Sequence, residues 1–297
     1  MPLKAEPLHP VFAARVTGLD MTRPLTPAET AEACALMDRY AVCVYPNATP
    51  LSNDQHIAFA RHLGPMQRGR VLTVTGRRER LGEWPELVDV GNLEADGNIR
   101  PADSRDRAFN HANRLWHTDM SFHPNRATYS LLNSHVIPVN GDGDTEFADE
   151  RAAYDALPIA MQAKIEGLIA SHSIWYSRQV SGFPEPTAEE LESRPPAEHK
   201  IAQIHPTSRR KTLYLASHAS HVIGMPLDEG RALLKELIDF ATQRQFVYRH
   251  KWTRGDVVIW DNRCTMHRAT PFDDLAFPRD MRRATCRENE IVEPFLH

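Results

Sequence analysis

The sequence predicts a mainly β protein with helices, in which helices decorate an antiparallel sandwich or barrel. Strand-like apolar runs dominate the second half of the chain, at residues 126–137, 170–176, 212–216, 246–252 and 257–260. Helical patterns at about 150–169 and 228–243 interrupt these runs without the regular strand and helix alternation of a parallel sheet. In 246–252 the residue character alternates with a period of two, which is typical of an antiparallel strand with one solvent-facing side.

The first sixty-odd residues predict a helix, a strand and a second helix. The segment Thr26–Glu29 forms a capping box, in which Thr and Glu side chains satisfy free backbone amides at a helix start, so a helix should cover 27–40. The apolar run 41–45 predicts a short buried strand. A second capping box at Ser52–Gln55 predicts a helix that Gly64 terminates.

The remaining stretch, from about 67 to 110, carries many charges and little hydrophobic periodicity. We expect it to be a long surface excursion that serves as a lid or substrate loop. The chain has 297 residues with 41% hydrophobic and 25% charged side chains, no internal repeat and no proline-rich linker. These features favour a single domain over residues 1–297.

Composition also limits the classes of function. A formal net charge of -4 gives no basic field for nucleic acid, which is therefore not an expected partner. There is no apolar run long enough to span a membrane and no signal-like N-terminus, so no membrane partner is expected. The four cysteines are scattered and are expected to be reduced, in the cytoplasm. Oligomeric state stays open, with a homo-oligomer as one alternative.

One histidine opens an H-x-D triplet, His117-Thr118-Asp119. In a strand, residues i and i+2 point to the same face, so the imidazole and the carboxylate could converge on a metal ion. The best third ligand is His267, which follows the strand at 257–260. Two histidines and one carboxylate form the facial triad of non-haem Fe(II) oxygenases, which leaves coordination positions open for a co-substrate and O₂.

The triplet alone is weak evidence, because a chain with 15 histidines is expected to contain about one H-x-D by chance. The arginines Arg279, Arg282 and Arg283 strengthen it, since they follow His267 on a segment that could return beside the metal. Arginine suits a carboxylate co-substrate because its planar fork makes two charge-assisted hydrogen bonds. Without the metal triad, a solvated strand face would explain these arginines equally well.

Three other features have both structural and functional interpretations. His218 and His221 could contact substrate or could form a structural pair near a sheet edge. Cys264 is interpreted as a core residue because no basic group is placed to activate its thiol. The segment 141–144 lacks the lysine of a phosphate loop and the length of a calcium loop, so it is interpreted as a tight turn.

The sequence resembles the taurine dioxygenase superfamily of Fe(II)/2-oxoglutarate enzymes. The resemblance is carried by segments 115–122, 143–145 with 152–157, and 260–268. It is closer still to the 2,4-dichlorophenoxyacetate dioxygenase branch, which degrades aryloxyalkanoate herbicides. This second likeness is carried by segments 7–14, 56–61, 217–221 and 241–250. Together these segments extend over nearly the whole chain.

The resemblance implies a double-stranded β-helix, or jelly-roll, core with iron at one mouth. It implies that His117, Asp119 and His267 bind Fe(II), and that no further side chain is needed as a catalytic acid or base. For the co-substrate 2-oxoglutarate it implies binding by Thr145 and Arg279. For the substrate it implies contacts from a set of three residues: Arg283, Asn113 and His218. No part of the 67–110 segment aligns with the family, and this segment is expected to shape the aryl pocket.

The leading hypothesis is a dioxygenase that uses O₂ to hydroxylate the carbon next to the ether oxygen of an aryloxyacetate such as 2,4-dichlorophenoxyacetate. The products would be a phenol, glyoxylate, succinate and CO₂. An alternative in the same superfamily is an alkylsulfonate or alkyl sulfate dioxygenase, since Arg283 would hold either anion. A non-catalytic, metal-stabilised jelly-roll binding protein and a zinc hydrolase are alternatives from other classes. Thr145 together with Arg279 argues against a hydrolase, which has no use for a 2-oxoglutarate site.

Overall fold

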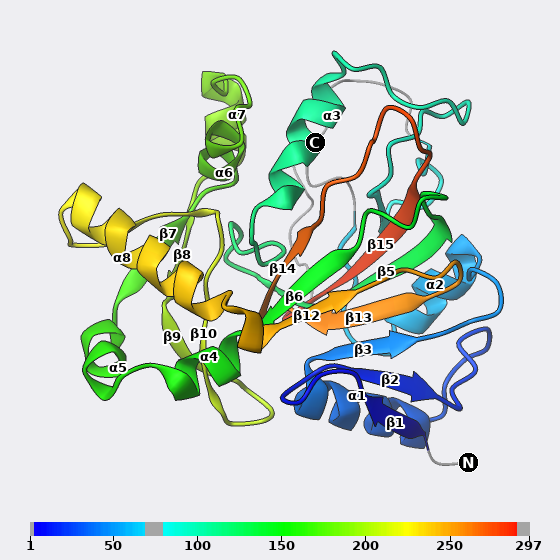
Figure 1. Cartoon of the computed structure of the whole chain (residues 1–297), viewed down its shortest axis with the longest axis horizontal. Coiled ribbons are helices and arrows are strands. Elements are labelled where there is room, and N and C mark those ends of the chain that lie inside the picture. Colours follow the sequence, from blue (N-terminus) through cyan, green and yellow to red (C-terminus); the bar gives the residue numbers. More distant parts are fainter. Residues whose placement is uncertain (1–2, 69–79, 290–297) are drawn as a thin grey trace.

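Two mainly antiparallel sheets lie in the middle of the molecule and helices cover their outer sides (Figure 1). The computed structural model describes residues 3–68 and 80–289. The larger sheet contains, in spatial order, β1 (Lys4–Pro7), β2 (Ala14–Thr17), β3 (Val42–Tyr45), β13 (Val257–Asp261), β5 (Ala127–Val136), β15 (Asp280–Arg287) and β4 (Leu87–Asp89). The smaller central sheet contains β12 (Val247–His250), β6 (Thr145–Asp149) and β14 (Thr265–Ala269).

Further small sheets lie outside the two central ones. One contains β11 (Ala219–Val222), β7 (Ile169–His172) and β8 (Ala197–Lys200), and the other contains β10 (Lys211–Leu213) and β9 (Ala202–Ile204). The helices are α1 (Pro27–Tyr40), α2 (Asn53–Ala60), α3 (Arg105–Asn110), α4 (Glu150–Ala156), α5 (Ile159–Ile165), α6 (Ile174–Val180), α7 (Ala188–Ser193) and α8 (Leu227–Ala241). Two 3₁₀ turns, η1 (His111–Arg114) and η2 (Arg244–Phe246), complete the set of described helices.

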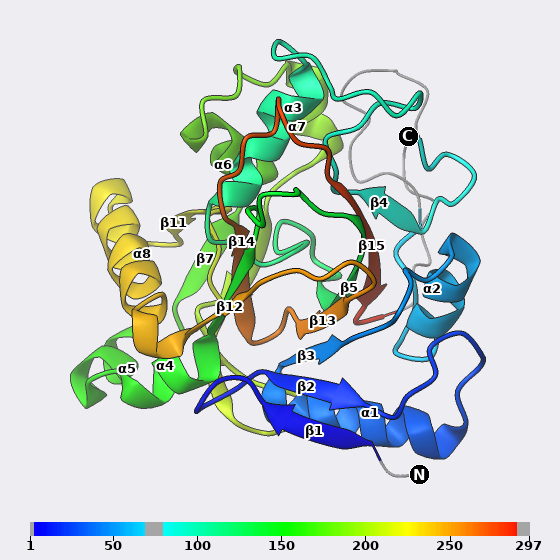
Figure 2. The same cartoon turned by 45° about the vertical axis from the view of Figure 1, so that its right-hand side comes forward.

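Strand β13 shows why the larger sheet is apolar on both faces. Val257 and Ile259 pack into the core under α1 and α2, whereas Val258 and Trp260 pack between the two sheets against Phe147 of β6. Alternate residues of a strand point to opposite faces, so a sheet covered on both sides needs a continuous apolar run. The strands of the two sheets surround a common centre (Figure 2). The predicted mainly β, jelly-roll architecture with helices is therefore confirmed.

Both predicted capping boxes are present. Thr26 accepts a hydrogen bond from the Glu29 amide at the start of α1, and Ser52 does the same for Gln55 at the start of α2. Helix α2 ends at Ala60, before the predicted stop at Gly64. The chain does not begin with a helix, however, because β1 and β2 precede α1. These strands have only four residues each, and β2 joins the sheet by parallel pairing with β3, a long-range contact that leaves no local pattern.

Two predicted elements are corrected. The helix expected at 150–169 is split into α4 and α5, because Leu157 is extended before Pro158. The strand expected at 170–176 ends at His172, where the Ser173 hydroxyl accepts from the Tyr176 amide and starts α6. A short apolar run does not distinguish a strand from a helix, and here the serine cap decides.

The segment 67–110 is more integrated than expected. Residues 69–79 of this predicted lid lie outside the described residues. Leu81 and Leu87 are buried in the main core, and β4 pairs with β15 as the edge strand of the larger sheet. Arg80 forms ion pairs with Asp89 and Asp280, at 2.8 and 2.7 Å. The expectation of a surface excursion is therefore wrong around β4, where Leu81 and Leu87 join the core and Arg80 is ion-paired. It holds for residues 95–98 and 101–103, which are exposed.

The cysteines are all free, and Cys43, Cys264 and Cys286 are buried. Within the described ranges, no helix is long and apolar enough to cross a membrane.

Gly255, in the turn before β13, lies so close to the backbone of Asn47 that a larger residue there should destabilise the protein. It has a φ of +96°, and a Cβ added there would overlap the carbonyl oxygen of Asn47. We expect Gly255→Ala to lower the free energy of unfolding by roughly 2 to 6 kcal/mol, from backbone strain plus overlap. Gly97, with a φ of +87° and open space around it, is the matched control and should lose only about 1 to 2 kcal/mol as Gly97→Ala. Equal losses in urea unfolding would contradict the overlap.

Candidate metal centre

His117 and His267 are brought together by the backbone. The two residues form an antiparallel bridge, with N to O distances of 2.9 and 2.8 Å in the two directions. Their ring centroids are 4.2 Å apart. His267 belongs to β14 and His117 lies outside any strand, so one local pairing joins residues that are far apart in sequence.

Asp119 reaches the two histidines by a turn instead of a strand. Only His117 of the triplet is bridged, and the chain then turns through Met120, whose φ is +57°. Side chains fix the carboxylate: the Asp119 amide donates to Asn262 Oδ1 at 3.2 Å, and Ser130 Oγ donates to Asp119 Oδ2 at 2.7 Å. The predicted convergence of the triplet is present, but the reason given for it, two residues on one face of a strand, is wrong.

The three side chains have the spacing of metal ligands. Asp119 Oδ1 lies 4.0 Å from His117 Nε2, and Asp119 Oδ2 lies 3.8 Å from His267 Nε2. These separations exceed hydrogen-bond length, but two atoms that each lie about 2.1 Å from one ion can be up to about 4.2 Å apart. All three residues are buried. His117 Nδ1 lies 2.8 Å from the Leu115 carbonyl oxygen, a contact that places the proton on Nδ1 and leaves Nε2 free to bind a metal.

The charges of the centre match this role. Burial lowers the pKa of both His117 and His267, so both rings are neutral at pH 7. Burial alone would raise the pKa of Asp119, but the guanidinium of Arg283 and the two histidines outweigh it and lower that pKa to about 2. Neutral imidazoles and an ionised carboxylate are the forms that bind a metal ion. His267 Nδ1 has no hydrogen-bond partner among the described residues. The donor set therefore fits a divalent ion of the iron type.

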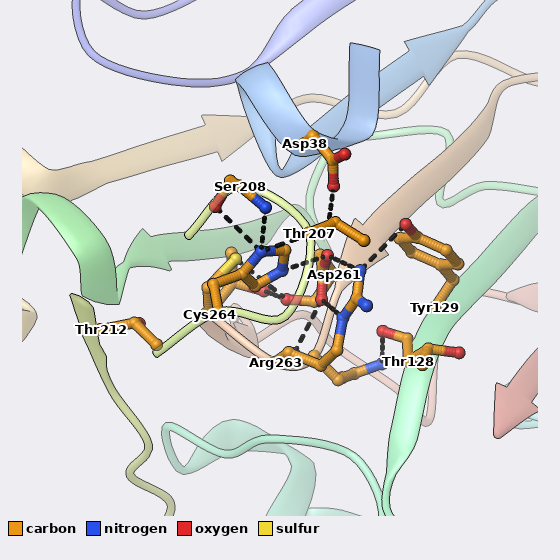
Figure 3. Close-up of polar contacts among 12 residues, drawn as sticks. Asp38, Thr128, Tyr129, Thr207, Ser208, Thr212, Asp261, Arg263 and Cys264 are labelled. Atoms are coloured by element: carbon orange, nitrogen blue, oxygen red, sulfur yellow. Dashed lines mark hydrogen bonds and ion pairs between the residues drawn. The ribbon is translucent and has the colours of Figure 1, made fainter. Parts of the chain in front are cut away.

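A second group, His205, Asp261 and Cys264, also has the spacing of metal ligands. Its carboxylate, however, is already paired with the side chain of an arginine. The Arg263 guanidinium pairs with Asp261 at 2.6 Å (Figure 3). His205 Nε2 lies 3.0 Å from the same carboxylate. Burial raises the pKa of the Cys264 thiol well above its usual value, so it is not a thiolate ligand. This group stabilises the turn between β13 and β14, and Cys264 is a core residue, as the sequence predicted.

The predicted 2-oxoglutarate residues lie on neighbouring parts of the same region. Arg279 is buried, and its guanidinium donates to the carbonyl oxygens of Val90 and Gly143, at 3.1 and 3.4 Å. Its Nε has no partner among the described residues, and burial lowers its pKa to about 10. A buried guanidinium held only by carbonyl oxygens has room for a carboxylate. Arg279 and Asn113 line one pocket together, with Phe272 on its wall.

Thr145 starts β6 opposite His250 of β12. Its hydroxyl accepts a hydrogen bond from Trp252 Nε1 at 3.0 Å. Because indole only donates, the hydroxyl proton of Thr145 is not used in that contact and can be donated to an anion.

Arg283 lies against the metal site itself. Its Nη1 donates to Asp119 Oδ1 at 2.5 Å, while its Nε is buried without a partner among the described residues. His218 is also buried beside the site, 6.0 Å from the His117 ring between centroids, and its Nδ1 lies 2.9 Å from Ser121 Oγ. The ring of His221 lies next to Ser220 instead, with its Nδ1 2.9 Å from the Ser220 hydroxyl.

Sequence reasoning missed Arg178, which projects from α6 and is 7% exposed. Its charge acts on Asp119 and Arg283, so it belongs to the surroundings of the metal site. No local signal marks it, because Arg178 lies just beyond the strand predicted at 170–176 and nothing in the sequence brings it near His117.

Comparison with known proteins identifies relatives along the full length. The profile of the family described as taurine catabolism dioxygenase TauD, TfdA family matches residues 4–285. The alpha-ketoglutarate-dependent 2,4-dichlorophenoxyacetate dioxygenase of Cupriavidus pinatubonensis is 44% identical over 98% of this chain and 100% of its own. The (S)-phenoxypropionate/alpha-ketoglutarate-dioxygenase of Sphingobium herbicidovorans is 35% identical over 90% of this chain and 89% of its own.

A solved structure extends this likeness to the fold. The crystal structure of AAD-2 in complex with Mn(II) and N-oxalylglycine superposes with a TM-score of 0.92 and 45% sequence identity. The match covers 98% of this chain and 99% of that one.

The three ligands can be tested by metal titration. We expect the unmodified protein to bind one Mn(II) per chain, and His117→Ala, Asp119→Ala and His267→Ala each to weaken that binding at least about tenfold, because one of three ligands is lost. His56→Gln is the matched control: it removes a buried histidine of α2, outside both histidine groups, and should lower stability while leaving Mn(II) binding unchanged. Calorimetry measures both the stoichiometry and the affinity. Unchanged binding in any of the three alanine variants, or loss of binding in His56→Gln, would contradict the assignment.

Proposed function

The chain belongs to the taurine catabolism dioxygenase TauD, TfdA family, and on that premise we propose that it hydroxylates aryloxyacetates such as 2,4-dichlorophenoxyacetate. Fe(II) is the cofactor and 2-oxoglutarate is the co-substrate. The observation that carries the substrate class is the full-length similarity to a 2,4-dichlorophenoxyacetate dioxygenase. The attacked carbon lies between the ether oxygen and the carboxylate, and the resulting hemiacetal breaks down to a phenol and glyoxylate.

In this proposal His117, Asp119 and His267 hold the iron. Fe(II) with 2-oxoglutarate and O₂ supplies the oxidising chemistry, in which 2-oxoglutarate becomes succinate and CO₂ while the substrate carbon gains an oxygen atom. The protein contributes position and the exclusion of water. The burial of all three ligands and the interlocked contacts of Asp119 with Ser130 and Asn262 suit that role.

Arg279 and Thr145 would hold the distal carboxylate of 2-oxoglutarate. The free Nε of Arg279 and the unused hydroxyl proton of Thr145 are the available donors. Asn113 lines the same pocket as Arg279. Arg283 would contact the substrate carboxylate through its free Nε while its Nη1 keeps Asp119 in place. His218, which is close to His117, and Asn113 would line the substrate side.

The test of the proposal is an O₂-uptake assay with Fe(II), 2-oxoglutarate and a panel of aryloxy acids, alkyl sulfonates and alkyl sulfates. Release of a phenol from 2,4-dichlorophenoxyacetate, matched by equal succinate, is the expected result. Sulfite or sulfate release without phenol release would favour the related anion-oxidising activity. No succinate with any compound, from protein that binds Mn(II), would favour a non-catalytic binding protein.

Arg279 gives a prediction about the co-substrate. Arg279→Ala should raise the KM for 2-oxoglutarate by at least about thirtyfold, because a buried carboxylate loses its charged partner at a cost of about 2 to 5 kcal/mol. The KM for the aryloxy acid should change little. A 2-oxo acid without the distal carboxylate is the control substrate, and its poor use should not worsen in the variant. Efficient use of that control compound by the unmodified protein would remove this role from Arg279.

Arg283 gives a prediction about the substrate. Arg283→Lys keeps the charge but loses the planar fork, so the aryloxyacetate should bind more weakly and more 2-oxoglutarate should be consumed per phenol formed, since a displacement of about 1 Å can reduce the rate about a hundredfold. Succinate and phenol are measured in the same reaction. Mn(II) titration of the variant is the control, because Arg283 also contacts Asp119. A ratio and a KM that both stay unchanged would place Arg283 outside the substrate site.

A further inference from the structure

We propose that Arg178 is a second anion-binding residue of the substrate pocket and that its guanidinium contacts the carboxylate of the aryloxy acid, together with Arg283. This inference rests on the proposed function, since it names a residue for the substrate of the same site.

Within residues 3–68 and 80–289, Arg178 is a buried cation without an anionic partner. It is 7% exposed, and its Nη1 donates a hydrogen bond to the hydroxyl of the adjacent Ser177, at 3.5 Å. Its Nε is buried with no partner among the described residues. Within the same described ranges, no ion pair of 4.0 Å or less is found for its guanidinium. A buried charge is strongly unfavourable unless it is paired, so this arrangement is typical of a site that an anion completes.

The helix that carries Arg178 lies beside the elements of the candidate metal centre. Helix α6 contacts η1, which follows α3 and contacts β14; α6, α3 and β14 lie on the same side of the molecule (Figure 2). Burial, and after it the charge of Arg283, lower the pKa of Arg178 to about 9 against the opposing effect of Asp119. Arg178 in turn contributes to the lowered pKa of His117 and His218. The guanidinium therefore shares one electrostatic environment with the metal ligands.

The two arginines near Asp119 carry one more positive charge than that carboxylate can neutralise. Arg178 and Arg283 bring two positive charges, whereas Asp119 is one carboxylate and is already held by Arg283 at 2.5 Å. Asp119 forms its ion pair with Arg283 and none with Arg178 among the described residues, so it is not the partner of Arg178. A carboxylate that arrives with the substrate can pair with both guanidiniums through charge-assisted hydrogen bonds.

The surroundings of Arg178 also suit the ring of an aryl acid. Its guanidinium lies over the ring of Phe109, 4.0 Å from the centroid. Phe109 packs edge-on against Phe183 at 5.5 Å, and Phe122 packs edge-on against His218 at 5.1 Å. These aromatic residues surround Ile174 and Trp175 of α6 in one apolar cluster. An anion-binding cation with an aromatic wall beside it matches a ligand that carries a carboxylate on an aryloxy group.

The test compares 2,4-dichlorophenoxyacetate with its primary amide, which has nearly the same shape and no charge. Binding of each compound is measured by calorimetry on protein loaded with Mn(II) and N-oxalylglycine, which does not turn over. For Arg178→Gln we expect the acid to bind about ten- to a hundredfold more weakly and the amide to bind within about twofold of the unmodified protein, because only the acid loses a charge-assisted hydrogen bond. Arg178→Lys should recover part of the loss for the acid.

Arg194 provides the matched control. It also has a buried Nε without a described partner, and burial lowers its pKa with no charge of the metal site acting on it. Arg194→Gln should change neither affinity. Because the acid and the amide are compared on one preparation, the ratio of their binding affinities does not depend on how much of a variant is folded.

The outcomes separate this inference from the proposed function. Equal losses for acid and amide in Arg178→Gln would show a packing role, and no loss would place Arg178 outside the site; either result overturns the inference. If the unmodified protein releases no phenol from the acid, the proposed function fails, yet the ratio of acid to amide binding still decides whether Arg178 recognises a carboxylate.

Discussion

The buried ion pair between Asp261 and Arg263 is the constraint on which the centre of this molecule depends. It closes the turn between β13 of the larger sheet and β14 of the smaller one. The same turn is tied to the Ala41 and Thr128 carbonyl oxygens through the amides of Asp261 and Asn262, at 2.8 and 2.7 Å. Removing one member of such a buried pair typically costs about 3 to 5 kcal/mol, because the other charge stays behind unpaired.

That turn positions the proposed metal ligands on both of its sides. Asn262 accepts from the Asp119 amide and donates to Ser130, whose hydroxyl holds the Asp119 carboxylate. Strand β14 begins at Thr265 and carries His267, which then fixes His117 by backbone pairing. All three proposed ligands are thus held by one short segment at the junction of the two sheets.

Features that depend on residues close together in the sequence could be predicted from it. The capping boxes of α1 and α2, the apolar run of β13 and the H-x-D triplet all leave patterns within a few residues, and the structure contains each of them. Long-range pairing leaves no such pattern, which is why β2, paired with β3, and β4, paired with β15, were missed. Strand β1 pairs with the nearby β2, but its four residues are mostly exposed and carry no apolar pattern. Arg178 shows a similar limit: its proposed role depends on burial and on its electrostatic interaction with Asp119, and burial of a single arginine in a short helix has no sequence signature.

The burial of the cysteines has a consequence for chemical durability. The thiolate, and not the thiol, is the form that oxidants attack, and exposure governs its access to them. Burial raises the pKa of Cys43 and of Cys286 to about 12 and that of Cys264 well above its usual value. The partly exposed Cys34 also has a raised pKa, from burial and from the charge of Asp38. The four cysteines of a protein whose reaction consumes O₂ are thus kept as protonated thiols. Peroxide released in an unproductive reaction cycle would therefore meet almost no thiolate to convert to sulfenic acid.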